Sequence, residues 1–276
     1  MDYKRVLTVQ DISCFGQCSL TVALPILSAA GLETCILPSA VLSTHTAGFS
    51  GYTFRDLTAD IPAITAHWKK ENIKFDAIYT GYLGSAEQIG YVMDMIRTLG
   101  KEKFVSIVDP AMADYGKLYP GFDAAFVEEM KKLAFSADII LPNITEACFL
   151  TGCEYNEKYD SSYIDELLAK LREGGAKTVI LTGVSYSDAT TGVVVLEGEN
   201  KQYYEHRKIP KGSHGTGDVY AAAFVGAYLR GKTAYESAGI AAEYTVRCIE
   251  NTIDDASHWY GVKFEPVLPY FIGQLN

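Results

Sequence analysis

GTGDVYAAAFVGAYL, residues 215–229, joins a glycine-rich turn directly to an apolar, alanine-rich segment. This sequence predicts a tight turn that leads into the first turn of a buried helix. The first backbone N–H groups of a helix have no partner within the helix, and the aligned peptide dipoles place about half a positive charge there. Phosphate groups bind readily at such an end, and two glycines let the backbone approach an anion closely. The segment therefore predicts an anion-binding site.

The residues of this turn suit different roles in one reaction. Gly215 and Gly217 offer backbone N–H groups, and Thr216 adds a hydroxyl donor between them, so all three are candidates for holding a phosphoryl group. Asp218 would repel a phosphate, so it is better suited to accept a proton from a substrate hydroxyl. Phosphoryl transfer requires this division of roles. The alternative interpretation is an ordinary acidic residue in the first turn of a core helix.

Three further polar residues follow predicted strands. Asp109 ends the apolar run 104–108, while Asn143 and Glu146 come just after the run 138–141. Ligands of open α/β sheets bind outside the carboxyl ends of the strands, so these residues can converge on one crevice. Hard oxygen ligands suit Mg²⁺, either directly or through water, and the set predicts a magnesium-nucleotide site. Taken singly, each residue also fits a turn or a helix start.

Strand-like and helix-like segments alternate along the chain. The predicted strands are 5–12, 34–41, 76–82, 104–109, 138–141 and 178–182. The predicted helices between them include 20–30, 61–70, 86–99, 122–133 and 162–173. This alternation predicts an α/β fold in three layers, with a mostly parallel central sheet and helices on both faces.

The remaining segments complete this picture. Segments 192–196 and 202–209, joined through 197–200, predict a hairpin that extends one edge of the sheet, and helices are expected from Asp218 onward and over 233–248. No linker or repeat interrupts the chain, which predicts a single domain over residues 1–276. The glycine-containing segments 43–51 and 114–121 suit flaps over a site, with plain surface loops as the alternative.

Composition narrows the classes of function. The 276 residues are 48% hydrophobic, enough for a large core, and the formal net charge of −10 argues against binding to nucleic acid or anionic membranes. No run approaches the roughly 18 apolar residues of a membrane span, and the N-terminus lacks the apolar core of a signal peptide, so a cytoplasmic location is expected. Six cysteines lack the paired spacing of a zinc site and are expected to be reduced.

The chain resembles the ribokinase-like small-molecule kinases, and among them the pyridoxal and pyridoxamine (vitamin B6) kinases. The likeness extends from about Leu7 to about Phe264. Its most specific pieces are TGYLGSAEQ at 80–88, VDP at 108–110, LPN at 141–143 with Glu146, and GTGD at 215–218. The resemblance implies ATP-dependent phosphorylation of the 5′-hydroxymethyl group of a vitamin B6 vitamer, with ATP and Mg²⁺ required, and a homodimer.

The resemblance also implies roles for individual residues. In that family the aspartate that matches Asp218 is the catalytic base, the turn before it forms the anion hole, and the pair that matches Asn143 and Glu146 organises Mg²⁺. The residues that match the pyridine site are Ser13, Thr46 and Tyr82. Those that match positions along the nucleotide and its ions are Asp109, Thr182 and Gly183.

Some positions depart from the family pattern. Ala111-Met112-Ala113 and Leu141 replace residues that are usual there, which leaves a monovalent-cation site near Leu141 open. His214 resembles the hydroxymethylpyrimidine kinases, relatives that commonly carry Cys at the position of Asp218. Asp218 therefore favours the vitamin B6 branch. Hydroxymethylpyrimidine kinase and a non-catalytic binding protein for a vitamer or nucleotide remain the alternatives.

Overall fold

The computed structural model describes residues 3–210 and 214–276, and a nine-stranded sheet forms its centre. The strand order is β11-β10-β9-β8-β5-β4-β1-β2-β3. The bounds are β1 (Arg5–Ser13), β2 (Glu33–Leu42), β3 (Phe54–Asp56), β4 (Phe75–Thr80), β5 (Gly100–Val108), β8 (Ile139–Ile140), β9 (Thr178–Val184), β10 (Thr190–Glu197) and β11 (Asn200–Arg207). The strands from β9 to β2 are parallel, whereas β3 and β10 run antiparallel to their neighbours. The predicted mostly parallel sheet is confirmed.

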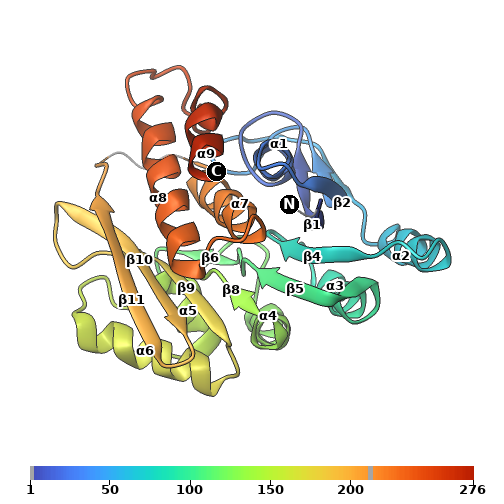
Figure 1. Ribbon diagram of the computed structural model, residues 1–276, viewed down its shortest axis with the longest axis horizontal. Coiled ribbons are helices and arrows are strands. Elements are labelled where there is room, and N and C mark those ends of the chain that lie inside the picture. The colour runs from blue at the N-terminus through green and yellow to red at the C-terminus, as the bar shows by residue number, and fades with distance from the viewer. Residues whose placement is uncertain (1–2, 211–213) are drawn as a thin grey trace.

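Helices cover both faces of the sheet, so the predicted three layers are also confirmed (Figure 1). One face carries α1 (Leu20–Ala29), α7 (Thr216–Leu229), α8 (Ala234–Glu250) and α9 (Leu268–Gln274). The other carries α2 (Ile61–Lys70), α3 (Ala86–Leu99), α4 (Ala124–Ser136), α5 (Ile144–Thr151) and α6 (Ser161–Glu173). Because successive strand side chains point to opposite faces, Val6 packs in the first core and Leu7 in the second.

The apolar segment that follows the glycine turn forms α7, which is buried on nearly every side. It packs against α1 and α8, and Gly226 lets it approach Ala30 and Phe271 closely. A helix that is apolar all round is stable only when its whole surface is covered. This burial fixes the direction of α7 and therefore the place of its N-terminal turn.

Several segments differ from the sequence-based expectations. Helix α4 begins after Asp123, whose side chain accepts a hydrogen bond from the Phe126 N–H at 2.9 Å, so it starts later than predicted. The hairpin of β10 and β11 at one edge was predicted correctly. The short helix α5, the edge strand β3, and the hairpin of β6 (Ala113–Asp114) and β7 (Lys117–Leu118) were not predicted as elements. The hairpin lies within the segment that was expected to be a flap.

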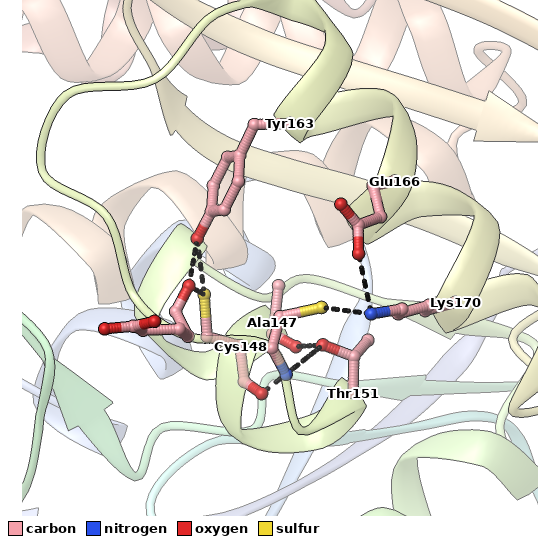
Figure 2. A network of polar contacts seen from close by, with 8 residues as sticks. Ala147, Cys148, Thr151, Tyr163, Glu166 and Lys170 are labelled. Atoms are coloured by element: carbon pink, nitrogen blue, oxygen red, sulfur yellow. Dashed lines mark hydrogen bonds and ion pairs between the residues drawn. The ribbon is translucent and has the colours of Figure 1, made fainter.

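A polar network fixes the C-terminal end of α5 against α6 (Figure 2). Tyr163 Oη donates to the Glu154 carbonyl at 2.8 Å and lies 3.0 Å from Cys148 Sγ, while Lys170 Nζ donates to Cys153 Sγ at 3.2 Å. All six cysteines are free, as expected. The network matters for the site because α5 carries Asn143 and Glu146 at its opposite end.

None of the helices in the described ranges is both long and apolar enough to cross a membrane.

Candidate active site

Polar residues from separate parts of the chain meet at the carboxyl edge of the parallel strands. Asp109 directly follows β5, and its backbone N–H donates to the Thr80 carbonyl at the end of β4 (2.9 Å). Asn143 follows β8 and pairs as a bridge with Thr182 of β9. The strand ends that carry Asp109, Asn143 and Thr182 are therefore adjacent, as the topology of an open α/β sheet requires.

The glycine turn adds its residues from the α7 side. Gly215 has a left-handed backbone with φ of 74°, and a Cβ placed there would lie 1.8 Å from the Gln17 carbonyl oxygen. Only glycine fits this close approach to the loop before α1. Among the described residues, a Cβ on Gly217 would meet no neighbour within 4 Å, which leaves space beside the N-terminal turn of α7. Such an end suits a phosphate group.

Asp218 lies in the first turn of α7 and is half-buried. Burial raises the pKa of its carboxyl to about 7, the Ser19 backbone N–H opposes this rise by donating a hydrogen bond, and the negative charge of Asp11 adds to it. A carboxylate with a pKa near neutrality can both take up and release a proton under physiological conditions. The geometry thus suits a general base beside an anion site.

A cluster of carboxylates surrounds this position. Burial raises the pKa of Asp109 well above its usual range, and the negative charges of Glu146 and Asp218 raise it further. Burial also raises the pKa of Glu146 to about 7, although backbone N–H groups of Asn143, Met112 and Ala113 stabilise its charged form. Clustered oxygen ligands with excess negative charge fit a hard divalent cation such as Mg²⁺.

Asn143 and Glu146 also have a structural role. They form a reciprocal capping box at the start of α5, in which the Glu146 N–H donates to Asn143 Oδ1 and the Asn143 N–H donates to Glu146 Oε2, both at 2.9 Å. Glu146 Oε1 accepts a third bond from the Met112 N–H at 3.1 Å. Within residues 3–210 and 214–276, no three His, Cys, Asp or Glu side chains are grouped to hold a metal. A metal role for the pair therefore depends on bridging water or on substrate phosphates.

The residues predicted to bind an aromatic substrate lie across the turn from α7. Tyr82 follows β4, is half-buried and stacks on Phe122 with ring centroids 5.4 Å apart. Burial raises the pKa of Tyr82, and the negative charge of Asp11 raises it further, so the two side chains are near each other. Ser13 is almost fully buried and donates to Asp11 Oδ2 at 3.0 Å, whereas Thr46 is exposed. Asp11 was missed by the sequence analysis because it lies inside an apolar strand.

Aromatic side chains and histidines from three loops pack against one another near these residues. Phe49, in the segment 43–51, packs on Trp259 with centroids 4.6 Å apart, and it also contacts His45. His45 is buried, lies 2.7 Å through Nε2 from the Tyr260 carbonyl oxygen, and has its ring 5.7 Å from that of His214. The segment 43–51 thus packs against the chain near its C-terminal end.

Thr182 and Gly183, predicted to contact the nucleotide, lie at the end of β9. The Thr182 N–H donates to the Pro142 carbonyl at 2.9 Å, which ties β9 to the segment that leads into α5. Gly183 has φ of 74° and is exposed, and a Cβ there would meet no neighbour within 4 Å in the part of the chain that the structure describes. Its carbonyl accepts a hydrogen bond from Tyr159 Oη at 3.3 Å. The two residues therefore border open space on the same edge of the sheet.

Comparison with known proteins places this arrangement among small-molecule kinases. Residues 27–262 match the family described as phosphomethylpyrimidine kinase. The hydroxymethylpyrimidine/phosphomethylpyrimidine kinase of Bacillus subtilis is 26% identical over 252 residues, which cover 90% of this chain and 83% of the relative.

Two solved structures are similar over nearly their whole length. A Bacteroides thetaiotaomicron protein whose name assigns it to the phosphomethylpyrimidine kinases, solved with pyridoxal, is 35% identical with a TM-score of 0.91, over 98% of this chain and 96% of that one. The pyridoxal kinase of Lactobacillus plantarum is 30% identical with a TM-score of 0.91, over 99% and 98% of the two chains.

Proposed function

Because this chain belongs to the phosphomethylpyrimidine kinase family and has the ribokinase-like fold, we propose that it transfers the γ-phosphoryl group of ATP to the 5′-hydroxymethyl group of vitamin B6 vitamers. Pyridoxal, pyridoxine and pyridoxamine are the expected substrates. Membership of the family makes the chain a kinase; the choice of substrate is the proposal. The solved relatives at 30% and 35% identity, one named a pyridoxal kinase and the other solved with pyridoxal, support this choice.

One observation carries the proposed mechanism: a carboxylate with a pKa of about 7 stands in the first turn of a helix. Asp218 would accept the proton of the substrate hydroxyl as that oxygen attacks the γ-phosphorus. The N–H groups of Gly215, Thr216 and Gly217 would stabilise the negative charge that develops on the transferred group. The base and the anion site act on the two reacting partners at once, which gives the alignment that phosphoryl transfer needs.

ATP would lie along the carboxyl edge of the strands, with Thr182 and Gly183 beside it. Asp109, Asn143 and Glu146 would hold Mg²⁺ through bridging water or the substrate phosphates, and the acidic character of Asp109 and Glu146 fits this ion. When bound, Mg²⁺ neutralises phosphate charge. Segments 43–51 and 114–121 would limit the access of water to the reacting groups.

The substrate ring would lie between Tyr82, Ser13 and Thr46, with its hydroxymethyl group at Asp218. The packing of Tyr82 limits how it can contact the ring. Because Phe122 stacks on one side of Tyr82, the ring of Tyr82 offers its other side or its edge to a substrate.

Hydroxymethylpyrimidine kinase is the second candidate. The family description and the Bacillus subtilis relative favour it, and His214 lies next to the glycine turn. A non-catalytic vitamer-binding protein is a third candidate, against which the base and the anion site argue.

The three candidates separate in one set of assays. ATP consumption is measured with pyridoxal, pyridoxine, pyridoxamine, hydroxymethylpyrimidine and ribose offered in turn. We expect at least one vitamer to have a kcat/KM at least ~10-fold above that of hydroxymethylpyrimidine, since small differences in ring fit are worth about 1–3 kcal/mol, and we expect ribose to be inert. A preference for hydroxymethylpyrimidine would place the enzyme with the second candidate. Tight vitamer binding without turnover would support the third.

A further inference from the structure

Asp11 is a buried acid in the middle of the candidate substrate site. It lies on β1, where the pairing with β2 shifts register: Gln10 pairs with Pro38 but Ile12 pairs with Val41. The extra residue on β2 makes a β-bulge opposite Asp11. Bulges are common next to active sites, and here the bulged strand is β2. The local geometry therefore departs from a regular strand at this acid.

The Asp11 side chain is held in place by hydroxyl groups. Asp11 is only 6% exposed, and Ser13 Oγ donates to its Oδ2 at 3.0 Å. The Ser19 hydroxyl also donates to this carboxylate, and both bonds oppose the rise in its pKa that burial causes. A carboxylate has about four acceptor positions, so two hydroxyl donors leave acceptor capacity.

Groups from four neighbouring elements face Asp11. After burial, its negative charge is a further cause of the raised pKa values of Cys18, Tyr82 and Asp218, and the charge of His45 acts on Asp11 in return. Ser19 links Asp11 to the proposed base, because its hydroxyl donates to Asp11 and its backbone N–H donates to Asp218. Apart from His45, whose pKa is lowered chiefly by burial, these neighbours bring no positive charge.

The charged form of a buried acid beside a second acid is unfavourable in free energy unless a hydrogen-bond donor or a cation stabilises it. The Ser13 and Ser19 hydroxyls compensate in part. A positively charged N–H group on the substrate would be a further donor to the Asp11 carboxylate. Hydrogen bonds between charged partners are stronger than those between neutral groups.

Vitamin B6 rings can supply such a group. Their ring hydroxyl is acidic and their ring nitrogen is basic, so near neutral pH the proton resides largely on the nitrogen and the ring carries an N–H⁺ group. Hydroxymethylpyrimidine has no acidic ring hydroxyl, and its ring nitrogens are less basic, so it is largely neutral at the same pH.

We propose that Asp11 accepts a hydrogen bond from the protonated ring nitrogen of a pyridine substrate and thereby selects vitamin B6 vitamers over hydroxymethylpyrimidine. This inference rests on the proposed function and adds a specificity residue to it. Asp11 acts on binding, whereas Asp218 acts on the transfer step.

The test compares Asp11→Asn with the wild type and with Asp165→Asn, an exposed acid on α6, as the matched control. Calorimetry without ATP gives the Kd of pyridoxine and of hydroxymethylpyrimidine for each protein. Asp11→Asn is expected to weaken pyridoxine binding by roughly 10- to 100-fold, the range for a hydrogen bond to a charged group, and to leave hydroxymethylpyrimidine binding nearly unchanged. Asp165→Asn is expected to change neither Kd.

The pH dependence of binding supplies a readout that a purely structural role would not change. Wild-type affinity for pyridoxine should fall as the pH rises and the ring nitrogen loses its proton, while affinity of Asp11→Asn should change less. The ratio of the pyridoxine and hydroxymethylpyrimidine Kd values at each pH removes the titration of Cys18, His45, Tyr82 and Asp218 in the free protein, which is common to both ligands. The same ratio is then compared between the wild type and Asp11→Asn, which keeps these four groups. A ratio in Asp11→Asn equal to that of the wild type overturns the proposal.

A second variant distinguishes a loss of selectivity from a folding defect. Ser13→Ala removes one donor to Asp11 and keeps the acid, so it is expected to lower the same selectivity by a smaller factor. An equal loss of affinity for both ligands in both variants would make Asp11 a structural residue and overturn the inference. Failure of the proposed function is distinct from either result, since it would appear in the wild type as no turnover of any vitamer.

Discussion

The Asp218 carboxylate shows how position changes the chemistry of one residue. An acid in the first turn of a helix is usually stabilised in its charged form by the helix dipole. Here burial outweighs this effect and raises the pKa to about 7, with Asp11 contributing. The balance between the two effects decides whether the residue is a helix-start acid or a base.

Replacement of Asp218 by Asn tests the base directly. Asn keeps the shape of the side chain and cannot take a proton, so we expect kcat to fall by roughly 10²- to 10⁴-fold while ATP binding and the thermal midpoint are retained. In the wild type, the base must be deprotonated to act, so kcat/KM should rise with pH through about 7, the pKa of Asp218. This rise of kcat/KM with pH should be absent in the variant. A wild-type kcat in Asp218→Asn would remove this residue from the mechanism.

Glu146 combines a structural and a proposed metal role, and Glu146→Gln affects both. Both carboxylate oxygens accept backbone N–H groups, so the amide of Gln would place its own donor against one of them. We expect a loss of about 1–2 kcal/mol in the free energy of unfolding, as for other lost caps, and a higher Mg²⁺ concentration for half-maximal rate. Chemical denaturation and a Mg²⁺ titration of the rate measure the two effects.

Helix α8 offers a matched control for this substitution. Glu236 forms the same capping box with Thr233 at the start of α8 and is not among the site residues. Glu236→Gln should lower stability and leave the Mg²⁺ requirement unchanged. If Glu146→Gln also leaves the Mg²⁺ titration unchanged, Glu146 is only a cap.

At the scale of elements, the glycine turn before α7 joins the anion site to the loop before α1. Gly215→Ala would bring a Cβ to 1.8 Å from the Gln17 carbonyl oxygen at a φ of 74°, so the turn must shift. Since a displacement of about 1 Å can reduce a rate by 10²-fold, we expect kcat/KM to fall by about that factor together with a lower thermal midpoint. Steady-state kinetics and a thermal melt measure these effects.

Gly217→Ala tests the anion site without an expected loss of stability. A Cβ at Gly217 would lie more than 4 Å from every neighbour within residues 3–210 and 214–276, so the thermal midpoint should stay at its wild-type value or rise. The added methyl group would instead enter the space proposed for phosphate and raise the KM for ATP. An unchanged KM for ATP would place the phosphates elsewhere.

The long elements could be predicted from the sequence because each combines a clear period with clear ends. Helix α3, for example, has the predicted bounds 86–99 and begins after Ser85, whose side chain accepts the Gln88 N–H. Helix α5 was missed as an element because its eight residues are almost all buried and have no amphipathic period. β3 and the β6–β7 hairpin have too few residues for any period.

Candidate residues at strand ends could be predicted because the topology of an open α/β sheet determines where they meet. Asp109 and Asn143 are examples. Asp11 could not be predicted in this way, since it precedes the end of β1, and its burial, its serine partners and its link through Ser19 to Asp218 arise only from the tertiary structure.

At the scale of the whole molecule, the helical layers cover the two faces of the sheet (Figure 1). The proposed ring-binding residues Ser13 and Tyr82 lie at the carboxyl ends of β1 and β4, and the proposed base and anion site lie at the start of α7. The chain has a net charge of −10, so its attraction for ATP must come from local groups and from Mg²⁺ rather than from the overall field. We therefore propose that phosphoryl transfer to a vitamer hydroxymethyl group takes place at the carboxyl ends of the strands.

The most direct test of that claim is to identify the product. The enzyme is incubated with ATP, Mg²⁺ and pyridoxine, and the products are measured by ³¹P NMR and mass spectrometry. The account predicts equal amounts of ADP and of pyridoxine phosphorylated on its 5′ oxygen. ADP formed without a phosphorylated vitamer, or phosphate carried by hydroxymethylpyrimidine and not by any pyridine vitamer, would contradict it.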